Sequence, residues 1–181
     1  MTQPRYVSIV FTLFIVFGFL GVALAQTQAP TPQPHKPACG PDHKILYKRA
    51  VTLLDNAEKK LNSRLTAEAK SMAKEAKSLF AILQKECGQD QKERPLTPKE
   101  EQQEAINQKL SADEQTAAEN LMKSAEEKFK KAEKLETTQP EMYSTLMRQA
   151  KFENEQAQKR SIKGMIYAMR TDQMLFSWLG K

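Results

Sequence analysis

Four side chains in this 181-residue sequence can bind a metal ion or form a covalent cross-link: His35, Cys39, His43 and Cys87. Cys39 and Cys87 are the only cysteines, and in an oxidising compartment such a pair forms a disulfide. Two cysteines and two histidines are also a ligand set for Zn²⁺. Their spacing is wider than in zinc fingers and His35 lies among prolines, so we predict a Cys39–Cys87 disulfide, with no metal and no cofactor. Two unpaired buried thiols are the remaining alternative.

The residues between the two cysteines predict the elements that bring them together. Apolar residues recur at spacings of three and four over 46–61 and again over 65–87, which is the pattern of a helix with one buried face. The polar turn at 62–66 offers Ser63 or Thr66 as an N-cap. Two antiparallel helices, each about 30 Å long, place positions 39 and 87 side by side. We therefore predict a disulfide-stapled helical hairpin over residues 42–88.

The N-terminus has the pattern of an export signal. Arg5 precedes an apolar run from Val7 to Leu20, and small residues end at Ala25. We expect cleavage after Ala25, which makes residues 1–25 a signal peptide and the protein periplasmic or secreted. Residues 7–25 are also long enough to span a bilayer, so an uncleaved membrane anchor is the alternative. Residues 26–41 hold five of the nine prolines and form a linker.

The second half of the chain predicts a second hairpin. After a polar linker at 89–96, Thr97, Pro98 and Glu100 have the pattern of a capping box at a helix start. A similar pattern at 111–114 predicts a restart or kink there. Apolar stripes over 118–135 and 143–157 flank a turn at 137–140. Residues 97–181 are thus a second hairpin with an apolar, basic C-terminal segment, and alanines of the two hairpins are expected to face one another.

The C-terminal segment allows two interpretations. It packs on the hairpin ends and completes the core, or it contacts a partner or a membrane surface, as basic amphipathic helices with tryptophan do. The candidate contact residues are Lys163, Met165, Ile166, Met169, Arg170, Leu175, Phe176 and Trp178.

The distribution of charge and the sequence motifs limit the kinds of partner and activity that this protein can have. Residues 26–95 carry 13 Lys and Arg against 8 Asp and Glu, whereas residues 96–181 carry 14 of each. This excess favours an anionic envelope surface as one kind of partner, while export argues against nucleic acid. The sequence contains no G-x-S-x-G, phosphate-binding glycine loop or H-E-x-x-H motif, so we expect no enzyme activity.

The run A-x-x-x-F-x-x-A-x-x-L, which starts at Ala125, and Ala150-Lys151 after it resemble the Ala-rich helical hairpins of exported bacterial envelope proteins of unassigned function. The alternation of Ala and Leu is also similar to the helix pairs of tetratricopeptide-type repeats, without their aromatic and proline signatures. The first resemblance covers about a quarter of the chain. It implies a periplasmic helical module and no catalytic residues.

These observations predict an all-α protein, with two antiparallel hairpins forming a four-helix, bundle-like or repeat-like domain. The predicted function is an exported, non-catalytic binding or scaffolding module of the cell envelope. Its partner is an unknown envelope protein or an anionic envelope surface, and homo-oligomerisation stays open. A membrane-anchored structural protein that retains the N-terminal helix is the alternative.

Overall fold

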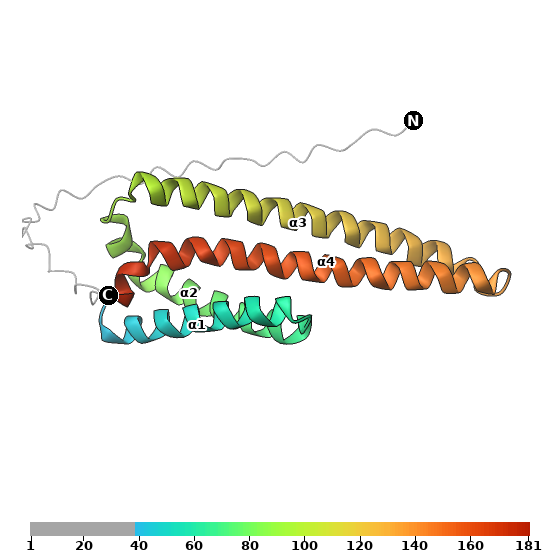
Figure 1. Ribbon diagram of the computed structural model, residues 1–181, viewed down its shortest axis with the longest axis horizontal. Coiled ribbons are helices and arrows are strands. Elements are labelled where there is room, and N and C mark those ends of the chain that lie inside the picture. The colour runs from blue at the N-terminus through green and yellow to red at the C-terminus, as the bar shows by residue number, and fades with distance from the viewer. Residues whose placement is uncertain (1–38) are drawn as a thin grey trace, which may run out of the picture. The chain divides into compact units, whose positions relative to one another are not determined.

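The computed structural model describes residues 39–181, and all regular structure in this range is helical, which confirms the all-α class. The predicted signal and most of the predicted linker lie outside these residues. Figure 1 shows the arrangement of the helices. The elements are α1 (Pro41–Asn62), α2 (Thr66–Lys92), α3 (Pro98–Glu133), α4 (Pro140–Leu175) and a short 3₁₀ helix, η1 (Ser177–Gly180).

Proline and capping side chains start the helices. Pro41, Pro98 and Pro140 each stand in the first turn of a helix, where a missing N–H costs no hydrogen bond. At α3 the predicted capping box is present: the Glu100 carboxylate accepts a 2.9 Å hydrogen bond from the Thr97 N–H, and the Thr97 hydroxyl accepts one of 3.4 Å from the Glu100 N–H.

Two predicted breaks are wrong. The helix α3 runs through Ser111 without a restart, because the Ser111 hydroxyl donates to α4 instead of capping its own chain. The helix α2 does not end at residue 88, where the predicted hairpin ends, but continues through Gly88 to Lys92 and shortens the predicted linker at 89–96. The Gly88 backbone is helical, and nothing lies within 4 Å of the place where a Cβ would stand. A glycine in a helix is only a propensity cost of about 1 kcal/mol, which neighbouring turns can offset.

The helices α1 and α2 pack against each other as an antiparallel pair, here called the first pair. Arg64, in the short turn between them, has a φ of 64°. Lys60 bonds to Glu68 at this end, and Cys39 meets Cys87 at the other. Along the contact, Ala50, Ala57, Ala69, Ala73 and Ala76 are fully buried, so the two backbones approach closely.

The hydrophobic core joins the first pair to the C-terminal part of α4 and to η1. Its largest fully buried side chains come from α1, α2, α4 and the residue before η1: Leu54, Phe80, Leu83, Ile162, Met169 and Phe176. The helix α3 adds nothing to this cluster. Among the described helices it packs on α4 alone, so α4 connects the first pair to α3.

The second pair, α3 and α4, has a seam of small residues at intervals of seven. On α3 these are Ser111, Ala118, Ala125 and Ala132, and on α4 they are Ala150, Ala157, Gly164 and Thr171. Because the backbone of α3 packs against α4 and not against α1 or α2, the alanines of α3 do not face those of the first pair, contrary to the prediction. Each set of alanines instead lines the seam within its own pair.

Candidate functional site

A disulfide joins α1 to α2 at the open end of the first pair. Cys39 and Cys87 form a disulfide with their Cα atoms 5.5 Å apart, as predicted. Cys87 is buried in the core and Cys39, just before α1, is half-buried against it. The Asp90 carboxylate accepts a 3.0 Å hydrogen bond from the Cys39 N–H, which ties the first residue of this region to the last turn of α2.

His43 lies beside the disulfide. One ring nitrogen of His43 and the two sulfur atoms are all within 4.8 Å of one another. The Gly40 N–H donates to Nδ1 of His43 at 3.1 Å, so Nδ1 holds a lone pair and Nε2 carries the proton. Nε2 lies 2.9 Å from a Glu86 carboxylate oxygen, to which it donates. The fold thus gathers three of the four residues that the sequence offered as an alternative ligand set, while His35 lies outside the described region.

The predicted contact residues of the C-terminal segment belong largely to the core. Ile166, Met169 and Phe176 are buried, so they are not available to a partner, and the prediction is corrected for these three. Met165, Leu175 and Trp178 are half-buried and pack against the same cluster. Their spacing places them on the face of α4 and η1 that meets the first pair. The burial of these positions agrees with the interpretation in which the C-terminal segment packs on the hairpin ends and completes the core.

The two cations in the predicted contact set have intramolecular partners. Arg170 bonds to Asp55 at 2.8 Å and to Glu58 at 2.5 Å on α1. Lys163 bonds to Glu114 on α3 at 2.8 Å, and Arg160 bonds to the same carboxylate at 3.0 Å. Burial alone raises the pKa of Glu114, but the hydrogen bonds and charges of Lys163 and Arg160 outweigh it and lower that pKa. The cations of this segment therefore form ion pairs that join α4 to α1 and to α3.

Trp178, the only tryptophan, meets a cation from the linker before α3. The guanidinium of Arg94 lies 4.2 Å from the centre of the Trp178 ring, within the range of a cation–π contact. The indole Nε1 is buried without a hydrogen-bond partner among the described residues. Tyr47 closes the same end, because its hydroxyl donates to the Gln173 carbonyl oxygen at 3.0 Å.

The part of the second pair beyond the first pair is a feature that the sequence interpretation missed. Figure 1 shows the ends of α3 and α4 nearest their connecting turn projecting past the turn between α1 and α2. We call residues 118–157 the arm. One groove is lined both by Arg64 and Thr66 at this end of the first pair and by α4 residues between Phe152 and Lys159, and counting along the seam from the Ser111–Gly164 contact pairs position 157 with position 118. Three large apolar side chains of the arm are mostly exposed: Met122 by 56%, Met142 by 51% and Phe152 by 61%.

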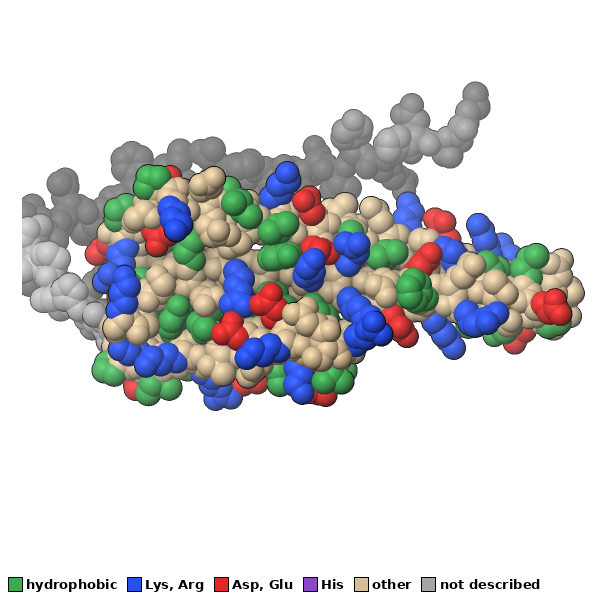
Figure 2. Space-filling view, viewed as in Figure 1, with side chains coloured by type: hydrophobic (Ala, Val, Ile, Leu, Met, Phe, Trp, Pro, Cys, Tyr) green, Lys and Arg blue, Asp and Glu red, His purple; other side chains and the backbone are tan. Residues whose placement is uncertain are grey.

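Phe152 shows why the arm is exposed. It stands two heptads before Ile166 and so shares the α4 face that carries the core residues. At Ile166 that face is covered by the first pair, whereas at Phe152 the first pair has ended. A groove of about 880 Å³ lies at this step, lined in part by Arg64, Thr66 and Phe152. Figure 2 shows hydrophobic side chains among Lys and Arg on the projecting part.

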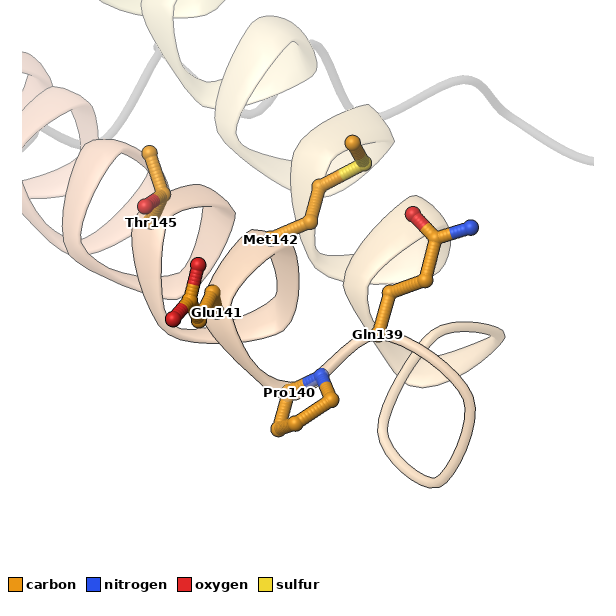
Figure 3. A pocket seen from close by; sticks show the side chains of 5 residues that line it. All are labelled: Gln139, Pro140, Glu141, Met142 and Thr145. Atoms are coloured by element: carbon orange, nitrogen blue, oxygen red, sulfur yellow. The ribbon is translucent and has the colours of Figure 1, made fainter.

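A second hollow, of about 670 Å³, lies at the tip of the arm. Figure 3 shows its lining side chains, which come from the turn and the start of α4: Gln139, Pro140, Glu141, Met142 and Thr145. Glu141 is the only ionisable group among them. The arrangement offers an apolar and amide surface for contact, without a second charged group that could share a proton with Glu141.

Comparisons of the chain with protein-family models, curated proteins and solved structures find no match. Within residues 39–181, no helix has the length and apolar character needed to cross a membrane.

Proposed function

We propose that this chain is an exported, non-enzymatic helical module that binds or scaffolds another component of the cell envelope. The signal pattern at residues 1–25 supports export, and the Cys39–Cys87 pair suits an oxidising compartment. The arm is the contact element in this proposal. A protein is favoured over an anionic surface as its partner, because residues 118–157 carry 7 Lys and Arg against 8 Asp and Glu and so have no excess of positive charge.

The exposed apolar side chains of the arm carry this proposal. The seam of the arm consists of small residues, and its flanks are fixed by polar contacts such as the Lys128–Glu153 ion pair at 2.6 Å. The helices α1 and α2 do not cover it, so Met122 and Phe152 keep most of their surface exposed to solvent. Apolar surface releases about 25 cal/mol per Å² when a partner covers it. Methionine adapts its shape to such contacts.

Affinity capture from an envelope extract tests the proposal with paired variants. The test variant is Met122→Ser with Phe152→Ser, and the control is Ile45→Ser on α1, where the side chain is 64% exposed. Since all three residues are at the surface, each protein should remain folded. We expect the arm variant to lose the partner that wild type and the control retain. Equal capture by all three proteins would exclude the arm as the contact.

The competing proposal is a membrane-anchored structural protein that retains residues 7–25. It is supported by the length of that apolar run. The two proposals differ in the N-terminal residue of the natural protein and in its partitioning into detergent. A protein that begins at Gln26 and stays in the aqueous phase supports an exported module, whereas an intact Met1 and partitioning into detergent support the anchor.

A further inference from the structure

We propose that Cys39, Cys87 and His43, at the open end of the first pair, form a metal site when the disulfide is reduced. Cys39, Cys87 and His43 supply two thiolates and one imidazole to a divalent cation of borderline softness, such as Zn²⁺. The oxidised protein binds no metal here, because both sulfur atoms are used in the disulfide. This site is independent of the contact proposed for the arm.

The geometry requires only small movements. In a tetrahedral zinc site, metal–sulfur bonds of ~2.3 Å and metal–nitrogen bonds of ~2.0 Å place two sulfur atoms about 3.8 Å apart and a sulfur and a nitrogen about 3.5 Å apart. The two sulfur atoms and a His43 nitrogen already lie within 4.8 Å of one another. The sulfur atoms must separate by about 1.7 Å from a normal disulfide bond, which side-chain rotation can provide. The α1–α2 packing holds the two backbones in place.

The surroundings of His43 match those of a metal-binding imidazole. Metal-bound histidines usually donate their other ring N–H to a carboxylate, which orients the ring. Here the Nε2–H already donates to Glu86, while the Nδ1 lone pair accepts only the Gly40 N–H. A metal ion bound through Nδ1 would replace that N–H and leave the contact between Nε2 and Glu86 in place. His43 has 17% of its side chain exposed, so an ion can reach it from solvent.

The chemistry balances with a dithiol as the reductant. The disulfide accepts two electrons and two protons and becomes two thiols, and the dithiol is oxidised to its own disulfide. The cation then replaces the two thiol protons, which pass to solvent, and forms two metal–thiolate bonds. A water molecule completes the coordination, as it does in zinc sites with three protein ligands. Either state keeps the start of α1 fastened to α2.

Metal counting on the purified protein tests the site. The protein is reduced with a phosphine, supplied with Zn²⁺ and analysed by native mass spectrometry. We expect one ion per reduced chain, and none on the oxidised chain or on the Cys39→Ser, Cys87→Ser double variant. Substitution of Co²⁺ should give the thiolate charge-transfer absorption of a tetrahedral site. Uptake that is equal in the reduced wild type and the double variant would overturn the proposal.

Two single substitutions distinguish a site that includes His43 and Glu86 from metal binding by the two cysteine thiolates alone. His43→Ala should weaken Zn²⁺ binding by at least tenfold, and Glu86→Gln by about ten- to a hundredfold. The matched control is Glu68→Gln, at the opposite end of the first pair, which should leave the affinity unchanged. Circular dichroism shows that each reduced variant is still helical. If His43→Ala binds Zn²⁺ as tightly as wild type does, His43 is only a helix cap and the proposed site is wrong.

Discussion

The Ser111 hydroxyl on α3 donates a buried hydrogen bond of 2.9 Å to the Gly164 carbonyl oxygen on α4. This contact is one of those that set the register of the second pair of helices. Counting seven residues along α3 and seven back along α4 from this bond pairs Ala118 with Ala157, and a further seven pairs Ala125 with Ala150. All four alanines are buried. The small residues of this seam resemble one another in shape, so polar contacts must distinguish its registers: this hydrogen bond does so inside the seam, and the α3–α4 ion pairs do so on its flanks.

Replacing Gly164 by leucine should open this seam. A Cβ at position 164 would lie 3.1 Å from the Ser111 carbonyl oxygen and 3.2 Å from Cγ of Gln115. Overpacking costs about 1–3 kcal/mol, and the better helix propensity of leucine offsets up to about 1 kcal/mol of it. With the full offset, we expect a net loss of up to about 2 kcal/mol in the free energy of unfolding, measured with urea. Ala168→Leu, on an exposed position one turn away, is the control and should change little.

Reducing the disulfide should destabilise the protein strongly. The bond closes a loop with a sequence separation of 48, for which chain entropy predicts a stabilisation of about 4 kcal/mol. Urea unfolding of the oxidised and the reduced protein, both with a chelator present, measures the difference without contribution from metal. Thiol titration of the undisturbed protein should find no reactive cysteine. Two titratable thiols would show that the natural protein does not carry the bond.

Glu114→Gln should weaken the attachment of α3 to α4. Glu114 is 12% exposed and bonds to both Arg160 and Lys163, so its removal should cost about 1 kcal/mol. Its pKa is lower in the folded protein, so this stabilisation is complete above its ordinary pKa of 4.5 and is lost as the pH falls through the lowered value. The control is Glu126→Gln, whose partner Lys130 is on the same helix. That pair is exposed and screened by solvent, so it should contribute less to stability than the contacts of Glu114. Equal losses in both variants would contradict this account.

Spacing and capping residues were sufficient to predict part of this structure. The helical class, the start of α3 at Thr97 and the meeting of Cys39 with Cys87 all follow from local patterns. These features depend on residues near one another in sequence, or on two helices of similar length that fold back. The spacing of apolar residues and the capping residues that predict these features can be found by analysing one helix at a time.

The partners of each helix face could not be predicted in the same way. Ser111 has the pattern of an N-cap, and only its position opposite Gly164 makes it a contact between helices. Phe152 and Ile166 lie on one helical face, yet the first is exposed and the second buried, because the first pair ends between them. The basic residues of the C-terminal segment suggested a surface site. Their carboxylate partners, Asp55, Glu58 and Glu114, lie 46 to 115 positions away in sequence.

Asp172→Asn should have the opposite pH dependence to Glu114→Gln. The half-buried Asp172 carboxylate accepts a 2.5 Å hydrogen bond from Gln84, and burial raises its pKa above the ordinary 3.8 despite this bond and the charge of Lys77. The folded state therefore favours the protonated form. The stabilisation that protonated Asp172 gives to the folded state is complete below pH 3.8 and is lost as the pH rises through the raised pKa.

Asparagine keeps an acceptor for Gln84 and removes the charge. We therefore expect Asp172→Asn to be more stable than wild type at neutral pH, with a difference that shrinks toward acid. Urea unfolding at a series of pH values measures this, with Asp113→Asn on the exposed face of α3 as the control. A variant less stable than wild type at pH 7 would mean that the charged carboxylate supports the contact between α2 and α4 instead of opposing it.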